Sequence, residues 1–253
     1  MKAFVIGLSF KETSYASAME AVEQLKQYGH DAEFFDGVPG DQALERAQVE
    51  GRQPFPYNIK SGVVDADELK NWIRPELYET FLERHYWKIS QRVKLNESGL
   101  GKVSLPGVVG CFYSHLALWR KCLELGEPIM IFEDDIVFYR NYEPVEWDEV
   151  LILGLGKTTY LEEPYRQYFE NPSGIPKAVV YKNSSMPGTC GYAITPRAAS
   201  KLIKTYRGYY CPSDNAIHRF VCEIKCHTYI MGRHKTEDEG NVSLTRTKEW
   251  QCK

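Results

Sequence analysis

The chain alternates short, continuous apolar runs with longer segments in which apolar residues recur every three or four positions. Residues 3–8 and 32–35 are apolar runs that predict strands, and residues 14–28 between them predict a helix. A strand, a helix and a second strand within 36 residues favour the parallel sheet of an α/β fold. The expected apolar stripe of this first helix consists of Met19, Val22 and Leu25.

The middle of the chain carries the clearest pattern. A helix is predicted from near Val109 to Leu125, and Pro128 prevents its continuation. Residues 129–132 are apolar without alternation, which is typical of a strand that is buried on both faces. The expected core face of the helix consists of Leu116, Trp119 and Leu123. Further along, the pattern predicts strands at 149–153, 190–194 and 227–231, and helices from Pro196 to before Gly208 and over 214–221.

Three segments give a weaker pattern. Residues 40–100 hold polar helical pieces and an aromatic group without a clear strand, and we interpret them as a helical insertion over the sheet, a candidate substrate lid. Residues 160–187 predict a loop or small hairpin, and residues 232–253 a C-terminal tail. The organisation predicted for residues 1–253 is a single catalytic domain with one insertion and one tail.

Composition and charge limit the choice of partners. The 253 residues are 43% hydrophobic and carry a net charge of −3, so bulk charge does not predict a polyanion-binding protein. Residues 197–235 nevertheless hold eight Lys and Arg against two Asp and Glu. This basic C-terminal third is compatible with contacts to phosphates, a membrane surface or nucleic acid; simple solvation of the charges is the alternative.

The seven cysteines are odd in number and irregularly spaced, which indicates reduced thiols. No hydrophobic run approaches the roughly 20 residues of a membrane span, and the N-terminal run lacks the longer core of a signal peptide. We therefore expect a cytoplasmic protein. The late cysteines and histidines do not have the spacing of a structural zinc site, which argues against zinc; they are Cys211, His218, Cys222, Cys226 and His227.

The apolar run 129–132 stops at three acids, Glu133, Asp134 and Asp135, here called the acidic triplet. Ligands of open α/β sheets bind beyond the carboxyl ends of the strands. Three carboxylates at such an end repel one another, and a divalent cation is the simplest partner for them. A solvated strand end, with the acids capping the next element, is the alternative interpretation.

Four motifs follow one another over most of the chain. They are Gly110–His115 with Trp119, Ile131–Asp135, Gly188–Ile194 and Pro212–Asp214. In this order they resemble glycosyltransferase family 25, which includes bacterial lipooligosaccharide galactosyltransferases and collagen hydroxylysine galactosyltransferases. The first two strands, Phe4–Ile6 and Phe34–Gly37, also fit, and the order of the four motifs makes the resemblance specific. A departure is Phe10-Lys11-Glu12, which stands where the family usually has arginines.

The resemblance implies a GT-A type, Rossmann-like fold with a mostly parallel central sheet flanked by helices. It also implies a UDP-sugar donor and a Mn²⁺ or Mg²⁺ ion, with the acidic triplet in the DxD role. By this carry-over, Asp135 binds the metal together with Glu133 and His234, and Glu133 or Asp134 contacts the ribose or the donor sugar. The other residues expected at the nucleotide-sugar site are Val5, Gly7, Leu8, Asp36, Ser114, His115, Gly191, Tyr192, Arg233 and Lys235.

The family inverts the configuration of the transferred sugar, so a general base is expected. Asp214 is the first candidate, with an N-cap of the following helix as the structural alternative. Glu237 and Asp238 are the second choice for the base, and Asp134 is the other residue expected to take part in catalysis. Gly191 and Tyr192 are expected to line the donor or acceptor pocket, the glycine allowing close approach and the tyrosine offering a ring face to a sugar.

The resemblance implies transfer of a hexose, galactose or glucose, to a saccharide of a lipopolysaccharide or another glycan. Hydroxylysine and a modified nucleic-acid base remain alternative acceptors. A metal-dependent hydrolase would use the same carboxylates but would leave the other motifs unexplained. A non-catalytic carbohydrate-binding relative is a third possibility, against which the intact acidic triplet argues.

Overall fold

The structure is a computed structural model of the chain. It describes residues 1–54, 105–155, 172–181, 186, 190–211, 213–219 and 221–236, without the side chains of residues 53, 54, 105, 214 and 215.

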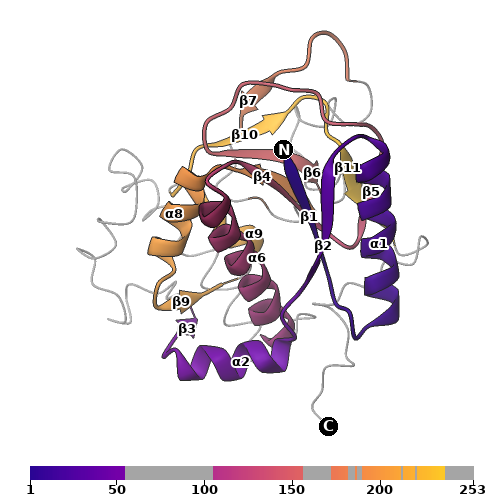
Figure 1. Cartoon of the computed structure of the whole chain (residues 1–253). Coiled ribbons are helices and arrows are strands. Elements are labelled where there is room, and N and C mark those ends of the chain that lie inside the picture. Colours follow the sequence, from indigo (N-terminus) through magenta and orange to yellow (C-terminus); the bar gives the residue numbers. More distant parts are fainter. Residues whose placement is uncertain are drawn as a thin grey trace.

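The described part of the chain is built on one mixed sheet of nine strands (Figure 1). Its main order is β2-β1-β4-β8-β6-β10-β7, with β11 pairing with both β5 and β6. The strands are β1 (Lys2–Gly7), β2 (Asp31–Asp36), β4 (Ile129–Glu133), β5 (Ile136–Phe138), β6 (Val150–Leu155), β7 (Ala178–Val180), β8 (Gly191–Ile194), β10 (Ile224–His227) and β11 (Gly232–His234). A separate parallel pair joins β3 (Gln53–Pro54) to β9 (Tyr209–Tyr210).

Most strands of the sheet point the same way. β2, β1 and β4 are mutually parallel, and β8 is antiparallel to both β4 and β6. β6 therefore runs in the direction of β4, and β10 and β11 are parallel to β6. The predicted α/β fold with a mostly parallel central sheet is confirmed, and it is consistent with a Rossmann-like GT-A fold.

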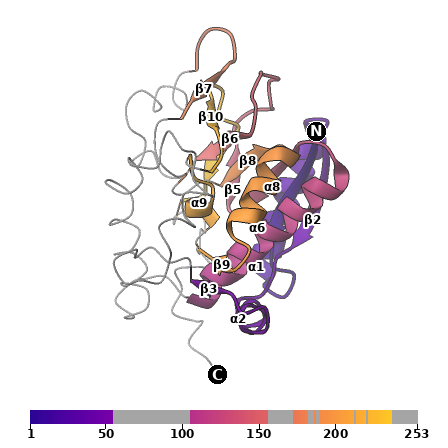
Figure 2. The same ribbon diagram turned by 90° about the vertical axis from the view of Figure 1, so that its left-hand side faces the viewer.

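Helices cover both faces of the sheet (Figures 1 and 2). Ile129 and Ile131 of β4 belong to the core with α2, α6 and α8, whereas Met130 and Phe132 belong to the core with α1. Successive side chains of a strand point to opposite faces, so an unbroken apolar run is what this position requires. The helices are α1 (Glu12–Gln27), α2 (Gly40–Val49), α6 (Leu105–Leu125), α8 (Pro196–Thr205) and α9 (Ser213–Ala216).

The long helix α6 carries the largest share of the core and ends where predicted. Gly126, with φ +69°, follows it, and its N–H donates to the carbonyl oxygen of Cys122 at 3.1 Å. Leu116 and Trp119 are buried as predicted, but Leu123 is 40% exposed. The prediction for Leu123 was wrong by one position, because Cys122 continues the buried stripe.

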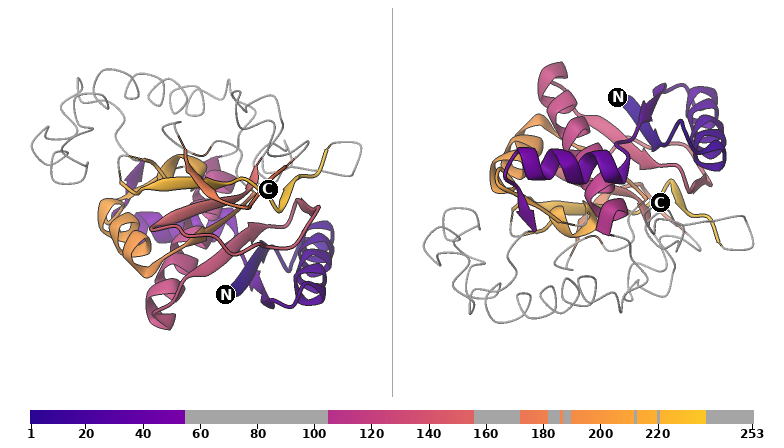
Figure 3. Two further views of the ribbon diagram at one scale, coloured as in Figure 1. Left: turned by 90° about the horizontal axis from the view of Figure 1, so that it is seen from above. Right: turned by 90° about the horizontal axis from the view of Figure 1, so that it is seen from below.

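The packing of α2 across α6 depends on two glycines (Figure 3). A Cβ atom on Gly110 would lie 2.6 Å from the carbonyl oxygen of Val38, and one on Gly40 would collide with Pro106. Glycine is therefore needed where the two chain segments approach. The helix α2 falls within the predicted helical insertion, whereas residues 55–100 of that insertion lie outside the described residues.

Four elements differ from the sequence prediction, three of them at the end of the described chain. The predicted helix over 214–221 is the four-residue α9, and the strand predicted at 227–231 is β10, which begins at Ile224. Residues 228–231 instead form a bend. This bend is needed because β10 pairs with the start of β6 and β11 with its end, so the chain changes position along one strand. The segment from residue 232 was predicted as tail but begins with β11, and β5 was not predicted.

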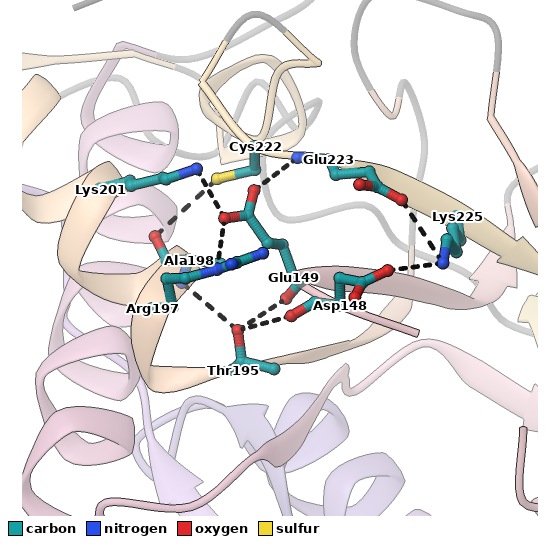
Figure 4. Close-up of polar contacts among 9 residues, drawn as sticks. All are labelled: Asp148, Glu149, Thr195, Arg197, Ala198, Lys201, Cys222, Glu223 and Lys225. Carbon is teal, nitrogen blue, oxygen red and sulfur yellow. Dashed lines mark hydrogen bonds and ion pairs between the residues drawn. The ribbon is translucent and has the colours of Figure 1, made fainter. Parts of the chain in front are cut away.

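A buried carboxylate anchors the end of the sheet opposite the acidic triplet (Figure 4). Glu149 is 2% exposed, and its Oε1 lies 2.9 Å from Nε of Arg197 and 2.6 Å from Nζ of Lys201, both on α8. Its Oε2 accepts from the N–H of Glu223 at 2.7 Å. A buried charge is tolerated when it is paired in this way. Two cations of the basic C-terminal third are thus paired within the molecule.

A second carboxylate joins α2 to α6 and generates a pH-dependent prediction. Glu50 accepts hydrogen bonds from Nε of Arg46 at 2.8 Å, Nε of Arg52 at 2.6 Å and the hydroxyl of Tyr113 at 3.0 Å. Partial burial alone would raise the pKa of Glu50, but these three donors outweigh it and lower the pKa to about 2. The ionised carboxylate therefore stabilises the fold.

We predict that Glu50→Gln lowers the free energy of unfolding at pH 7 by about 1–2 kcal/mol, a figure reduced for solvent screening. Because the pKa of the folded state is the lower one, the wild-type advantage is present above about pH 4.5 and is lost as the pH falls toward 2. Urea unfolding of both proteins from pH 7 to pH 3 checks this. A difference between them that stays constant with pH would contradict the prediction.

Candidate functional site

The three acids at the end of β4 point to three different partners. Glu133 is the last residue of β4, and its N–H donates to the carbonyl oxygen of Cys190 at 2.9 Å. Asp134 and Asp135 form the turn that leads into β5. The carboxyl ends of the parallel strands β1, β2 and β4 lie at the same edge of the sheet. The acidic triplet therefore lies at the edge where ligands of such sheets bind.

The third acid faces a histidine from the far end of the chain. Nδ1 of His234 lies 2.8 Å from Oδ2 of Asp135. The antiparallel pairing of β11 with β5 places His234 opposite Ile136, and the N–H of Lys235 donates to the carbonyl oxygen of Asp135 at 2.6 Å. Backbone pairing across about 100 residues of sequence thus fixes this contact, because each ladder position sets the next.

Glu133, Asp135 and His234 together form a group that has the donor atoms of a metal site. One donor atom from each lies within 4.8 Å of the other two. Their side chains are 26%, 21% and 16% exposed, so the group is open to small solutes. Oδ1 of Asp135 is buried and has no hydrogen-bond partner among the described residues. Such an oxygen is costly unless a ligand fills its coordination, so these residues fit a divalent cation.

The second acid has a different environment. The hydroxyl of Ser14 donates to Oδ2 of Asp134, and the same hydroxyl oxygen accepts from the N–H of Leu8 at 2.9 Å. Burial raises the pKa of Asp134 to about 7, and the negative charges of Asp135 and Glu133 add to the shift. Asp134 therefore connects the end of β4 to the loop between β1 and α1.

The first acid faces a buried polar group on α6. Nε2 of His115 lies 3.4 Å from Oε1 of Glu133, and Nδ1 of His115 lies 2.8 Å from the hydroxyl oxygen of Tyr192. Nε1 of Trp119 donates to the same hydroxyl at 2.9 Å. Burial keeps the pKa of Tyr192 well above its ordinary value, so the hydroxyl retains its proton. Cys111 also brings its sulfur within 4.8 Å of His115 and Glu133.

The sequence matches the family model of glycosyltransferase family 25 (LPS biosynthesis protein) over residues 1–217. This range covers β1 through α9 and includes the acidic triplet. The chain belongs to glycosyltransferase family 25. His234 lies beyond the residues that the family model matches, although it is adjacent to Asp135 in space.

Two curated relatives support the assignment over part of the chain. The "Lipooligosaccharide biosynthesis protein lex-1" of Haemophilus influenzae is 30% identical over 132 residues, which are 46% of this chain and 41% of that protein. The "Procollagen lysyl hydroxylase and glycosyltransferase" of Acanthamoeba polyphaga mimivirus is 32% identical over 147 residues, which are 54% of this chain and 16% of that protein. The chain thus spans less than half the length of either relative. No helix in the described part of this family 25 chain has both the length and the apolar character of a membrane span.

Several family 25 motif residues serve the fold. Ser114 is buried, donates to the carbonyl oxygen of Gly110 at 2.8 Å and accepts from the N–H of Val38 at 2.9 Å. The side chain of Val5 is fully buried, and a Cβ atom on Gly7 would lie 2.7 Å from that of Ala18. These contacts position the strand ends around the site and place the side chains of Val5 and Ser114 inside the core. The nucleotide contacts expected of the two residues stay a prediction.

The structure places Gly191 and Tyr192, which were predicted to line a sugar pocket, inside the sheet. Tyr192 is 2% exposed, and its ring stacks on His115 with centroids 5.7 Å apart. A Cβ atom on Gly191 would collide with the ring of Phe132, so the glycine is needed for packing inside the sheet. Likewise His115 is buried and faces Glu133.

The remaining predicted residues lie around the edge of the site. Asp36 accepts from the N–H and the hydroxyl of Ser9, at 2.9 and 2.6 Å. Arg233 lies over the ring of Tyr139, with 5.7 Å between its guanidinium carbon and the ring centroid. Nζ of Lys235 donates to Oγ of Ser17 on α1 at 2.8 Å. Both basic residues are thus in contact with the protein itself, near the strand that carries His234.

Asp214 and Ser14 are two further residues of the candidate site. Asp214 lies on α9, and the structure describes its backbone but not its side chain. Ser14 was not predicted, because a serine near the start of a helix is a common capping residue and carries no separate signal of a contact with Asp134.

Among the late cysteines and histidines, His227 uses both ring nitrogens for backbone contacts, with Glu143 and Tyr229 at 2.7 and 2.8 Å. Both ring nitrogens of His227 are thus occupied by backbone groups.

The pairing that brings His234 to Asp135 generates a prediction. A Cβ atom on Gly232 would collide with the carbonyl oxygen of Val137, which belongs to the partner strand β5. Gly232→Ala should therefore lower the free energy of unfolding by about 1–3 kcal/mol through overpacking. Gly208→Ala is the matched control, since nothing lies within 4 Å of its added Cβ. Equal thermal unfolding midpoints for the two variants would refute the prediction.

Proposed function

We propose that this chain is an inverting, metal-dependent hexosyltransferase that moves a hexose from a UDP-sugar to a hydroxyl group of a glycan. The observation that carries the proposal is the group formed by Glu133, Asp135 and His234 at the carboxyl end of β4, in a chain of glycosyltransferase family 25. Two carboxylates and an imidazole suit a divalent metal such as Mn²⁺, with Mg²⁺ as the harder alternative.

A bound divalent cation would neutralise the negative charge that develops on the leaving diphosphate. The chain's own residues supply the remaining parts. Asp134 and Ser14 hold the loop after β1 against the end of β4, so the edge that receives the donor is fixed before binding. Asp36, at the end of β2, lies along the same edge.

The proposed general base is Asp214. It would accept the proton of the acceptor hydroxyl while the hydroxyl oxygen attacks the anomeric carbon from the face opposite the departing UDP. The new C–O bond forms as the sugar–phosphate bond breaks, which inverts the configuration. Its place on α9 supports this role: the side chain of the neighbouring Ser213 lies 3.1 Å from the sulfur of Cys111, and Cys111 itself adjoins Glu133.

The proposed acceptor is a saccharide of a lipopolysaccharide or related glycan. The family description and the lipooligosaccharide name of the Haemophilus influenzae relative support it. Hydroxylysine is the second candidate acceptor, which the name of the mimivirus relative favours. Assays of one UDP-sugar panel against a truncated lipooligosaccharide and against a hydroxylysine peptide distinguish the two.

Calorimetric titration with UDP, in manganese and again in EDTA, tests the donor and the metal together. We expect micromolar binding that disappears when EDTA removes the metal. Asp135→Ala should lose this metal-dependent binding and at least about 100-fold of the transfer rate, while the thermal unfolding midpoint changes little. Glu124→Ala, on the exposed surface of α6, is the control. Normal turnover in Asp135→Ala would place the metal elsewhere.

The base is tested separately. Asp214→Asn keeps the size and the capping ability of the side chain but removes its basicity. We expect UDP affinity to stay within about twofold of wild type and kcat to fall on the order of 100-fold or more. Turnover at the wild-type rate would reduce Asp214 to a helix cap.

A further inference from the structure

We propose that His115 is a positioning residue: its Nε2–H holds the carboxylate of Glu133 in place for cation binding, and Tyr192 and Trp119 fix the proton on that nitrogen. This inference rests on the proposed function, because it concerns the same Glu133, Asp135 and His234 group. It adds a line of buried side chains behind the first acid, reaching from α6 through β8 to β4.

Hydrogen bonds connect this line as far as His115. Nε1 of Trp119 lies 2.9 Å from the hydroxyl oxygen of Tyr192, which lies 2.8 Å from Nδ1 of His115. The rings of His115 and Tyr192 stack with 18° between their planes. Nε2 of His115 is buried without a hydrogen bond among the described residues and lies 3.4 Å from Oε1 of Glu133, so a small shift of that carboxylate would give it an acceptor. Trp119, Tyr192 and His115 are all at least 97% buried, so water does not compete along the line.

The hydrogen-bond network assigns the tautomer of His115. The indole nitrogen of Trp119 is only a donor, so the hydroxyl oxygen of Tyr192 accepts from it. The hydroxyl proton of Tyr192 then needs an acceptor, and among the described residues the one within reach is Nδ1 of His115. A buried hydroxyl without an acceptor would be costly. In neutral His115 the ring proton therefore sits on Nε2, the nitrogen that faces Glu133.

A carboxylate that receives an N–H on one oxygen loses freedom to rotate and presents its other oxygen to the site. Partners of this kind orient metal ligands, and their loss typically costs about 10–100-fold in metal affinity. His115 belongs to α6 and Glu133 to β4, so the contact also ties the first acid to the largest helix of the core. Without it, Glu133 would be free to turn away from Asp135.

A second group of three residues, Cys111, His115 and Glu133, also has donor atoms that are close enough to bind a metal ion. A cation there would require the lone pair of Nε2 and would move the ring proton to Nδ1. The hydroxyl proton of Tyr192 would then lose its acceptor among the described residues. The network thus favours Nε2 as a donor to Glu133 over Nε2 as a metal ligand.

The experiment compares two amides at position 115. The side-chain nitrogen of Gln reaches about as far as Nε2 of histidine, whereas that of Asn reaches only about as far as Nδ1. His115→Gln therefore keeps a donor for Glu133, and His115→Asn keeps only the contact with Tyr192. Both variants bury a neutral amide at the same place, and because Asn fills less of the histidine's volume than Gln, the unfolding midpoints show whether a difference between them comes from packing. Mn²⁺ is titrated into each full-length protein, free Mn²⁺ is measured by electron paramagnetic resonance, and thermal unfolding is recorded in parallel.

We expect Mn²⁺ affinity to fall on the order of tenfold or more in His115→Asn and to stay within about threefold of wild type in His115→Gln. Cys111→Ser is the control and should bind Mn²⁺ like the wild type. Equal affinities for the Asn and Gln variants would overturn the proposal, and so would a Cys111→Ser variant that no longer binds. A wild-type protein that binds no Mn²⁺ would instead defeat the metal site of the proposed function, and this inference with it.

Discussion

Repulsion among three adjacent carboxylates at the end of a buried strand is the constraint on which the site depends. Because all three cannot be ionised side by side without compensation, each faces a separate partner. The first acid faces His115 on α6, the second is bound by Ser14 on α1, and the third faces His234 on β11. These partners come from both helical layers and from the last strand of the sheet. The acidic triplet therefore joins the layers at the edge where the donor is proposed to bind.

The three acids consequently have different tasks. Burial raises the pKa of the second acid, Asp134, to about 7, and its contact with Ser14 fixes the loop after β1. The first and third remain partly exposed and converge with His234. A site with one acid turned inward and two turned outward keeps its shape before a ligand arrives, which is what preorganisation requires.

The opposite end of the sheet shows the same physical rule without a site. Glu149 is also a buried carboxylate, but two cations of α8 pair with one of its oxygens and a backbone N–H donates to the other (Figure 4). The difference lies in what remains unpaired. Neither Oδ1 of Asp135 nor Oε1 of Glu149 makes a hydrogen bond among the described residues, but Oε1 of Glu149 lies 2.9 and 2.6 Å from two cationic nitrogens, and no such ion pair reaches Oδ1 of Asp135 in the described part of the chain. Incomplete pairing, more than the presence of acids, distinguishes a candidate ligand site from a structural anchor.

Local pattern was enough to predict the early strands, α1, α6, β4 and the start of α8. Each of these is a run of residues whose period, cap or terminating glycine acts within one or two turns of chain. The apolar run of β4 and the three acids after it were visible for the same reason. The order of the family motifs also identified the family from the sequence alone, and the match over residues 1–217 agrees with it.

What the sequence could not determine depends on long-range pairing. The bend at residues 228–231 exists because β10 and β11 use different ends of β6, and no local pattern records that. The same pairing decides that His234 meets Asp135. The sequence also could not show which side of the sheet a polar motif residue faces, so Tyr192 was predicted to line a pocket although it lies in the core. The sequence by itself determined which chemical groups the site contains; the tertiary structure decided which of them face the ligand and which hold the others in place, because strand register and helix packing are set by contacts between residues far apart in the chain.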